Sequence, residues 1–478
     1  MTQLQTLFGW IGDATWGWAL IPFLVVFGGT FTLMSGFVQL RYFGRMWGVL
    51  SEGGNRAGGV SSREALLVSI GGRVGGGNIA GVAVAITLGG PGAVFWMWVV
   101  AFIGMATSLF ECALAQLYKR SEDDGTFRGG PAQYIIHGLG ERFTWLAMLY
   151  AVCLLASFGL GFSAFQGNTV AVAAQDSLGL DPIWVGAGLA LVTLIIVFGG
   201  IKRIAQVSDV VIPVMALGYI VLALAVIVLN ITEVPAALWT IVANAVGLEE
   251  AVGGGVGAAV AQGMRRGLFS NEAGLGSAPN VAAAAAVPHP ISQGIVQSLS
   301  VFIDTIIICT CTAMVILLGD VYVPGATEVD GVALTQQSLV DHLGGWAQYF
   351  LTGAVLLFAF SSIIYNYYLG ETALSVLSDT KIARLLLRVA VPVVVFLGAA
   401  APGATAVFFF SDPLMGLLAL VNLLALAMLF PVGLRLLADY RRQLRAGAVE
   451  PVLEIEDYAD LDIARGAWAN PALTRPLG

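Results

Sequence analysis

Long apolar runs alternate with short polar segments along most of the chain. A helix needs ~20 apolar residues to cross the hydrocarbon core of a bilayer. The sequence therefore predicts eleven membrane-spanning helices, at 16–40, 64–88, 91–118, 143–168, 182–200, 209–230, 255–287, 291–318, 343–376, 386–408 and 412–435. A shorter apolar stretch at 234–246 predicts a partly buried helix outside the main bundle, and the acidic, Pro- and Ala-rich end of the chain predicts a soluble tail.

The second of these runs contains an unusual stretch, GGRVGGGN, at positions 71–78. Glycine costs roughly 1 kcal/mol relative to alanine inside a helix, and a charge such as that of Arg73 is expensive in a membrane. A helix that loses its regularity inside a membrane must have its freed backbone groups buried in protein or facing a polar cavity. The sequence therefore predicts a broken helix here, with glycine permitting the required backbone angles and leaving room for a small solute.

The seventh run has a matching interruption, GMRRGLFSNEAGLGSAPN, at 263–280. Five spans separate the two starts, so the two helices cross the membrane in opposite directions. Paired, interrupted segments of this kind indicate inverted repeats and the binding site of a secondary transporter. We expect an N-terminal helix and loop (1–61), a first five-helix repeat (62–230), an extracellular connection (231–251), a second five-helix repeat (252–435) and a cytoplasmic tail (436–478).

Composition supports an all-α polytopic membrane protein and narrows the function. Of the 478 residues, 58% are hydrophobic and 11% are charged, which is far from the balance of a soluble protein. The four cysteines lie in apolar runs and predict no disulfide framework. The sequence has no metal-binding His/Cys cluster and no recognisable nucleophile with its base, so it gives no indication of an enzyme. An ion channel is the other alternative, but the chain lacks the repeated filters or charged rings that it would need.

Basic residues predict the orientation, because Lys and Arg gather in short cytoplasmic loops. They follow spans one, three, five, nine and eleven, and they are absent from the alternate loops 89–90, 169–181, 231–234, 319–342 and 409–411. We therefore expect a multi-pass membrane protein with its N-terminus outside and its C-terminus in the cytoplasm; the family resemblance described below implies the plasma (inner) membrane of a bacterium. Lipid and a small molecule are the expected partners, with no nucleic acid.

Several of these segments resemble one known family. The runs GNIAGVAVAITLGGPGAVFWMW (77–98), GMATSLFECALAQLYKR (104–120), GGPAQYI (129–135), GLFSNEAGLGSAPNVAAAA (267–285) and HPISQG (289–294) are similar to those of the alanine or glycine:cation symporter family of bacteria and archaea. The resemblance covers about 64–376. It implies a leucine-transporter-like fold and uptake of a small neutral amino acid coupled to sodium or, less commonly, to protons, with no organic cofactor.

The resemblance also implies where ligands bind. The coupling sodium ion would meet carbonyl groups near the first interruption and hydroxyls of FAFSSII (358–364), namely Gly71, Val74, Ser361 and Ser362. The substrate site implied by the family comprises Gly75, Gly76, Gly77, Asn78, Gln166, Phe269, Asn271 and Asn366.

Two departures from the family pattern affect specificity. The family commonly has Thr where this chain has Gly76, and a Gly-Trp pair where this chain has Tyr365 and Asn366. Replacing Trp by Asn removes bulk and adds an amide near the expected pocket. A larger neutral amino acid such as glutamine is therefore an alternative to alanine or glycine.

Ionisable groups at membrane depth are rare and usually face the protein interior. Three acids (Glu111, Glu272 and Asp304) and three bases (Arg73, Arg265 and Arg266) are predicted there. We expect them to neutralise one another, with a proton or sodium carrier among the acids as the alternative. His289 stands between two prolines and predicts a turn, in preference to a role in proton transfer.

Overall fold

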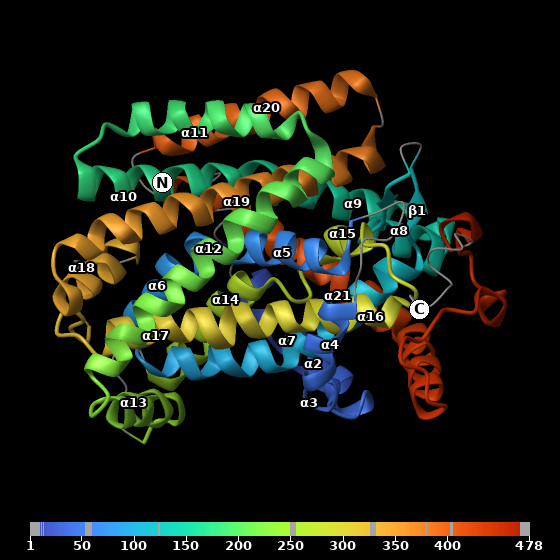
Figure 1. Cartoon of the computed structure of the whole chain (residues 1–478), viewed down its shortest axis with the longest axis horizontal. Helices are drawn as coiled ribbons and strands as arrows, with labels where there is room; N and C mark the ends of the chain where they lie inside the picture. Colours follow the sequence, from blue (N-terminus) through green and yellow to red (C-terminus); the bar gives the residue numbers. More distant parts are fainter. Residues whose placement is uncertain are drawn as a thin grey trace.

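The computed structural model describes residues 10, 12, 14–52, 60–122, 125–248, 255–325, 331–378, 380–401 and 405–468. Most helices run along one long axis of the molecule (Figure 1). The elements are η1 (Ala14–Leu20), α2 (Ile21–Met34), α3 (Val38–Arg41), α4 (Phe43–Glu52), α5 (Ser62–Arg73), η2 (Gly77–Gly81), α6 (Val82–Gly89), α7 (Gly92–Leu117), β1 (Arg120–Ser121), β2 (Phe127–Arg128), α8 (Pro131–Gln133), η3 (Tyr134–Gly138), η4 (Glu141–Phe143), α9 (Thr144–Leu154), η5 (Leu155–Phe162), α10 (Ser163–Leu178), α11 (Pro182–Val197), α12 (Gly200–Leu229), α13 (Val234–Val246), α14 (Gly255–Asn271), α15 (Ala278–Ala283), α16 (Pro290–Val301), η6 (Phe302–Cys309), α17 (Thr310–Leu317), α18 (Gly331–Leu343), α19 (Trp346–Leu377), α20 (Lys381–Ala399), α21 (Thr405–Arg445), η7 (Ile455–Tyr458) and η8 (Arg465–Ala467).

Eight helices or helix series in the described residues are long and apolar enough to cross a membrane, and the bent pair Ser62–Arg73 and Gly77–Gly89 makes a ninth. The fold is therefore that of an all-α polytopic membrane protein, as predicted. The fifth and seventh predicted spans correspond to α11 and α14, which have 16 and 17 residues and are shorter than the others.

Local signals in the sequence explain several helix starts. Ser61 and Glu64 form a capping box at α5, in which the Ser61 side chain accepts from the Glu64 amide and the Glu64 side chain accepts from the Ser61 amide. Asp181 caps α11 in front of Pro182. His289 caps α16, because its Nδ1 accepts from the Ile291 amide at 3.1 Å, which fits the turn role predicted for it.

Some predicted boundaries were wrong. The segment 319–342 was predicted as a loop, but α18 occupies 331–343, where polar residues interrupt the apolar pattern. The first span ends at Met34 instead of 40, because Gly36 and Phe37 adopt left-handed backbone angles. Helical structure in the fourth span continues to Leu178 instead of stopping at 168.

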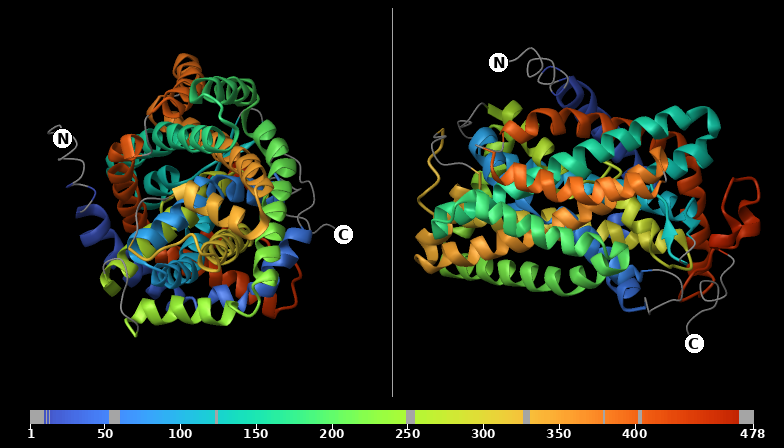
Figure 2. Two further views of the ribbon diagram at one scale, coloured as in Figure 1. Left: turned by 90° about the vertical axis from the view of Figure 1, so that its left-hand side faces the viewer. Right: turned by 90° about the horizontal axis from the view of Figure 1, so that it is seen from above.

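The two interrupted spans lie in the middle of the molecule. They are flanked by α7 and α16 on one side and by α10 and α19 on the other (Figure 1). Views from the end and from above show the N-terminal helix η1–α2 outside this group, where it contacts α7 and α21 (Figure 2). The short helix α13 packs against α7 and α14 with a part of its surface exposed, as predicted for 234–246.

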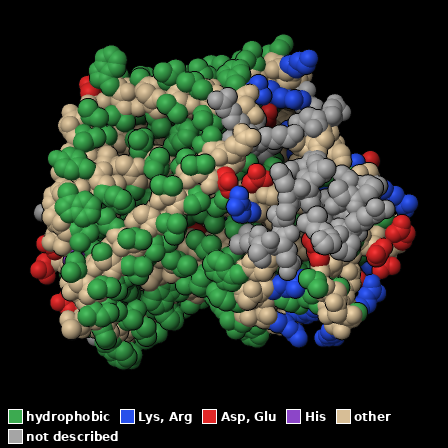
Figure 3. All heavy atoms as spheres, viewed as in Figure 1, with side chains coloured by type: hydrophobic (Ala, Val, Ile, Leu, Met, Phe, Trp, Pro, Cys, Tyr) green, Lys and Arg blue, Asp and Glu red, His purple; other side chains and the backbone are tan. Residues whose placement is uncertain are grey.

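The two ends of the bundle differ in their content of basic side chains (Figure 3). We call the end that carries the residues after α21 the tail end. Basic side chains gather there, and hydrophobic side chains cover most of the remaining surface on the same face (Figure 3). The small hairpin of β1 and β2, which pairs Arg120 with Arg128, also lies at this end.

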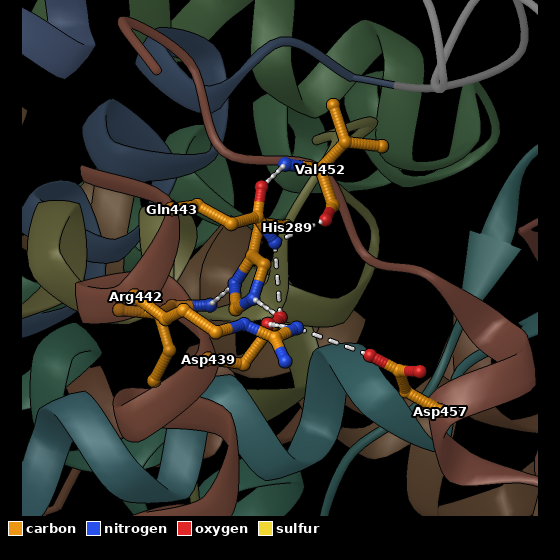
Figure 4. Close-up of polar contacts among 7 residues, drawn as sticks. His289, Asp439, Arg442, Gln443, Val452 and Asp457 are labelled. Atoms are coloured by element: carbon orange, nitrogen blue, oxygen red, sulfur yellow. Dashed lines mark hydrogen bonds and ion pairs between the residues drawn. The ribbon is translucent and has the colours of Figure 1, made fainter. Parts of the chain in front are cut away.

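The segment that the sequence predicted as a soluble tail folds back onto the end of the bundle. Gln443 Nε2 donates to the Val452 carbonyl at 2.7 Å, and its Oε1 accepts from the Val452 amide at 2.9 Å (Figure 4). The next amide, of Leu453, donates to the Pro288 carbonyl at 2.9 Å. The tail therefore continues as a strap across the loop that leads to α16.

Ion pairs hold the same strap in place. Arg442 bridges Asp439 at 2.6 Å and Asp457 at 3.1 Å, and His289 lies 3.3 Å from Asp439 (Figure 4). Exposed ion pairs contribute little individually, so we attribute the position of the tail mainly to its backbone hydrogen bonds and buried side chains.

Trp468 closes the strap over a buried lysine. Its indole Nε1 donates to the Leu117 carbonyl at 3.3 Å, and its ring lies 4.4 Å from Lys119 Nζ. Lys119 Nζ also lies 4.3 Å from the Phe127 ring and donates to the Ala285 carbonyl at 3.1 Å. Burial lowers the pKa of Lys119 to about 7.

Candidate substrate and ion site

The first interrupted span bends where the sequence predicted. Ser62–Arg73 and Gly77–Gly89 meet at 52°, and Val74 between them has extended backbone angles. The bend frees amide groups that side chains then bind. Asn78 Oδ1 accepts from the Gly75 amide at 2.9 Å, and Gln166 Oε1 accepts from the Gly76 amide at 3.3 Å.

The glycines of this bend serve close packing, and the predicted need for unusual backbone angles was wrong. The described glycines with positive φ do not include any between 71 and 77. A methyl group on Gly72 would instead lie 2.3 Å from the Tyr365 ring, and one on Gly75 would lie 2.5 Å from Ser362 Oγ. Side chains of another helix therefore leave no room for a larger residue at Gly72 or Gly75.

The predicted ion ligands meet in one place. Ser361 Oγ donates to the Gly71 carbonyl at 2.8 Å, and Ser362 Oγ lies 3.2 Å from the same oxygen and 3.1 Å from the Gly72 carbonyl. Carbonyl and hydroxyl oxygens are ligands that hard cations accept, and all of these groups are buried. Val74, the remaining predicted ligand, lies at the bend where α5 ends.

An aromatic wall borders the bend on the side of Gly77. A methyl group on Gly77 would lie 3.3 Å from the Phe269 ring. Phe269 in turn packs against Phe162, with ring centroids 4.7 Å apart, and against Phe165, with centroids 6.4 Å apart. Phe269 is therefore brought to the bend as predicted, and Phe162 and Phe165 are additional wall residues that apolar patterning alone did not distinguish from core.

The second interrupted span has a different construction. α14 ends at Asn271, and the chain then passes through Glu272, Gly274 and Gly276 with φ values of 54°, 87° and 84° before α15 begins. Both oxygens of the Glu111 carboxylate lie 3.2 Å from the Gly274 amide. Here a buried acid accepts from the freed backbone, whereas neutral amides do so in the first span.

The contact between the two interruptions involves Ser270, the neighbour of the predicted substrate-site residue Asn271. Asn78 Nδ2 donates to Ser270 Oγ at 2.9 Å and to Asp304 Oδ1 at 2.6 Å. Asn271 Oδ1 accepts from the Ala273 amide and lies on the side of Gly104 in α7. Sequence reasoning missed Ser270, although its place beside Phe269 in the same motif was the available signal.

Two predicted site residues carry polar atoms without a partner. Within the described residues, Nδ2 of Asn271 and Nδ2 of Asn366 are buried and make no hydrogen bond. Asn366 follows Ser362 by one helical turn, so both lie on the same face of α19. Unpaired buried amides are costly, so a polar ligand that reached either of them would relieve that cost.

The electrostatic interaction of Arg73 with Glu111, Glu272 and Asp304 agrees with the expected neutralisation of buried acids by a buried base, although no salt bridge within the described residues joins Arg73 to an acid. Arg73 donates to Ser108 Oγ at 3.3 Å, to Ser300 Oγ and to the Gln297 carbonyl at 3.4 Å. Arg265 and Arg266 lie over aromatic rings, of Trp16 at 5.8 Å and of Phe269 at 5.4 Å.

Two interrupted spans that meet among amides, hydroxyls and carbonyls are the arrangement of a helical secondary transporter with a leucine-transporter-like fold. The structure of MhsT in complex with L-phenylalanine shares this fold, with a TM-score of 0.56 and 14% identity over 80% of this chain and 99% of that one. The model of the sodium:alanine symporter family matches residues 1–455, and the chain belongs to this family.

Curated relatives match over nearly their whole length. The amino-acid carrier protein AlsT of Bacillus subtilis is 46% identical over 458 residues, covering 96% of each chain. The probable sodium/glutamine symporter GlnT of the same organism is 44% identical over 447 residues, covering 93% of this chain and 92% of that one. Membership confirms the resemblance seen in the sequence, and it makes the protein a transporter and not an enzyme.

Proposed function

We propose that this protein couples sodium entry to the uptake of a small neutral amino acid, alanine or glycine, by alternating access. The observation that carries the proposal is the convergence of Ser361 and Ser362 on the Gly71 and Gly72 carbonyls, directly beside the bend. In this proposal sodium binds at Gly71, Val74, Ser361 and Ser362 and displaces the hydrogen bonds that now join them.

The amino acid binds next to the ion. The backbone amides of Gly75 and Gly76 receive its carboxylate when the Asn78 and Gln166 side chains turn away from them. Phe269 and Gly77 bound its side chain. The remaining proposed contacts are Asn271 and Asn366, whose amide nitrogens are unpaired. Because the ion attracts the carboxylate, the two ligands bind with positive coupling, and such coupling is reciprocal.

Glutamine is the second candidate substrate. A single observation favours it, namely the buried, unpartnered amide of Asn366 where the family pattern has Trp. A site with an amide to pair discriminates strongly against a substrate that leaves it unpaired. The relative GlnT, named a probable sodium/glutamine symporter, is consistent with this alternative.

The arrangement in the membrane follows from the charge asymmetry. We place the tail end in the bacterial cytoplasm, because basic side chains gather there, and the N-terminus outside. We also propose that 62–230 and 252–435 are two inverted repeats that rock against each other, with 1–61, 231–251 and 436–478 as additions.

Uptake into proteoliposomes tests the function. Purified protein should accumulate labelled alanine only with an inward sodium gradient, with saturation and without ATP, and unlabelled glycine, D-alanine, serine and glutamine should be compared as competitors. Uptake that is indifferent to sodium would reject the coupling ion. Strong competition by glutamine with none by glycine would reject the small substrate.

Two variants test the sites separately. Asn78→Ala should abolish binding of the amino acid, because it loses the contacts that shape the bend. Ser361→Ala combined with Ser362→Ala should raise the sodium concentration needed for half-maximal uptake. An unchanged affinity in the first variant, or an unchanged sodium requirement in the second, would contradict the respective assignment.

A further inference from the structure

Three hydroxyl groups on one face of α19 bind the interrupted spans at successive turns. Ser361, Tyr365 and Tyr368 are spaced by four and three residues, the spacing of one helix face. Ser361 Oγ donates to the Gly71 carbonyl at 2.8 Å, Tyr365 Oη to Glu272 Oε2 at 3.0 Å, and Tyr368 Oη to the Asn280 carbonyl at 3.4 Å. We call these three contacts the hydroxyl ladder.

The ladder lies between the proposed ion site and the tail end. α19 runs from Trp346 to Leu377 with its last turns at the tail end (Figure 1), so Tyr365 and Tyr368 follow Ser361 in that direction. Both tyrosines are buried, with 0% and 3% of their surface exposed. A path from the site to the tail end along this face of α19 is therefore closed.

Tyr365 is the member that touches both interrupted spans at once. Its ring covers Gly72 in the first span so closely that a methyl group there would lie 2.3 to 2.5 Å from three ring atoms. Its hydroxyl binds Glu272, the first residue of the second interruption. Glu272 also accepts from Ser277 Oγ on the far side of that interruption, so one carboxylate connects α19 to both sides of the break.

The backbone at Glu272 makes this contact distinctive. Glu272 has a φ of 54°, a conformation that residues other than glycine rarely adopt and that needs support from the surroundings. The hydrogen bonds from Tyr365 and Ser277 provide such support. Opening the tail end would separate α19 from the interrupted spans, and the contact between Tyr365 and Glu272 would break.

We propose that Tyr365 is a gate residue, and that its contacts with Gly72 and Glu272 hold the tail-end pathway closed. The inference rests on the alternating access of the proposed function. Neither Tyr365 nor Glu272 belongs to the proposed ion or substrate site, so the gate is a separate assignment.

Labelling of an introduced cysteine tests the gate. Thr372 lies two turns beyond Tyr365 and lines a small pocket at the tail end with Asn280 and Tyr150. Thr372 has 4% of its surface exposed, so Thr372→Cys provides a reporter that reacts when the pathway opens. The reaction of the protein without this change, whose four native cysteines are also buried, is subtracted. The rate of reaction with a membrane-impermeant maleimide added from the tail side is measured without sodium and without amino acid.

The Tyr365→Phe exchange keeps the ring over Gly72 and removes only the hydroxyl. We expect a roughly ten- to hundredfold faster reaction of the reporter, the range that corresponds to loss of one hydrogen bond to a charged group. Glu272→Gln keeps an acceptor without the charge, and it should give a smaller increase. The matched control is Tyr219→Phe, which removes another buried tyrosine hydroxyl, bound to Thr312 at 2.7 Å and outside the ladder.

Three possible results of the labelling experiment support or overturn the gate. An increase in Tyr365→Phe with none in Tyr219→Phe supports the gate. Equal rates in Tyr365→Phe and the unmodified reporter protein overturn it, and so does an equal increase in both tyrosine variants, which would indicate general loosening. Labelling requires no transported substrate, so failure of sodium-driven alanine uptake would reject the proposed function and leave this test readable.

Discussion

The first interrupted span bends where side chains of other helices press against its backbone, whereas the second turns through residues with left-handed backbone angles. Gly72 is covered by the Tyr365 ring at a φ that any residue could adopt. Gly274 and Gly276 instead have φ values of 87° and 84°. Glycine is therefore required for space in the first span and for conformation in the second.

The two spans also differ in the groups that bind their freed backbone. The amide oxygens of Asn78 and Gln166 serve the first, while the carboxylate of Glu111 serves the second. An incoming ion or amino acid can displace the neutral side-chain amides of Asn78 and Gln166 at a modest cost in free energy. A buried charge that loses its hydrogen bonds is far more expensive, so we expect the second interruption to stay intact during transport while the first rearranges.

The largest effect should come from Gly72→Ala. The added methyl group would lie 2.3 Å from the Tyr365 ring, and overpacking costs typically 1–3 kcal/mol. We expect loss of transport and a lower melting temperature in detergent. An unchanged melting temperature and normal uptake in Gly72→Ala would contradict the requirement for space over this backbone.

Glu111→Gln should have the next largest effect. It removes the charge that accepts from the Gly274 amide and from Asn422 Nδ2 at 3.1 Å. Hydrogen bonds to charged groups contribute about 1.5–3 kcal/mol, so the melting temperature and the maximal uptake rate should fall. The KM for the amino acid should be unchanged. A selective rise in KM would mean that this carboxylate acts in the substrate site.

Gly274→Ala should cost about 1–2 kcal/mol through its left-handed backbone. The nearest obstacle is the flexible Leu423 side chain at 2.9 Å, so crowding is the smaller part of the cost. The companion change Leu423→Ala should therefore fail to restore the melting temperature. Full recovery in that double variant would erase the distinction between the two spans.

Gly81→Ala should have the smallest effect, with the opposite sign. Gly81 lies in η2, just beyond the first bend, with nothing within 4 Å of an added methyl group and a φ of −68°. Gly→Ala at a compatible site stabilises by about 0.4–1 kcal/mol. A slightly higher melting temperature with normal uptake is expected, and a clear loss of uptake would indicate that this helix must remain pliable.

The sequence predicted both interruptions because polar residues and clustered glycines within an apolar run have few structural explanations. It also predicted that Ser361 and Ser362 meet Gly71, since the family motif specifies both partners. The contact of Ser270 with Asn78 was not predicted, because it depends on the rotation of α14, which adjacent polar residues do not fix. The partners of Arg73 depend on which helices pack around it, and no local pattern encodes that.

Two other regions escaped prediction for similar reasons. α18 contains the polar residues Thr335, Gln336 and Ser338. Its apolar run is therefore too short to predict a membrane helix. The tail is acidic and rich in Pro and Ala, a composition that suggests solvation. Its attachment depends on a few groups, Leu453 and Trp468 among them, whose partners Pro288 and Leu117 lie far earlier in the chain.

The lysine beneath Trp468 gives the protein a built-in indicator of tail docking. The chain contains three lysines. Lys119 is fully buried under the indole, whereas Lys381 is exposed at the start of α20. Acylation of lysine amines followed by peptide mass mapping would therefore measure how often the strap leaves the bundle, because Lys119 becomes modified only when Trp468 no longer covers it. Lys381 serves as the internal reference, and no engineered label is needed.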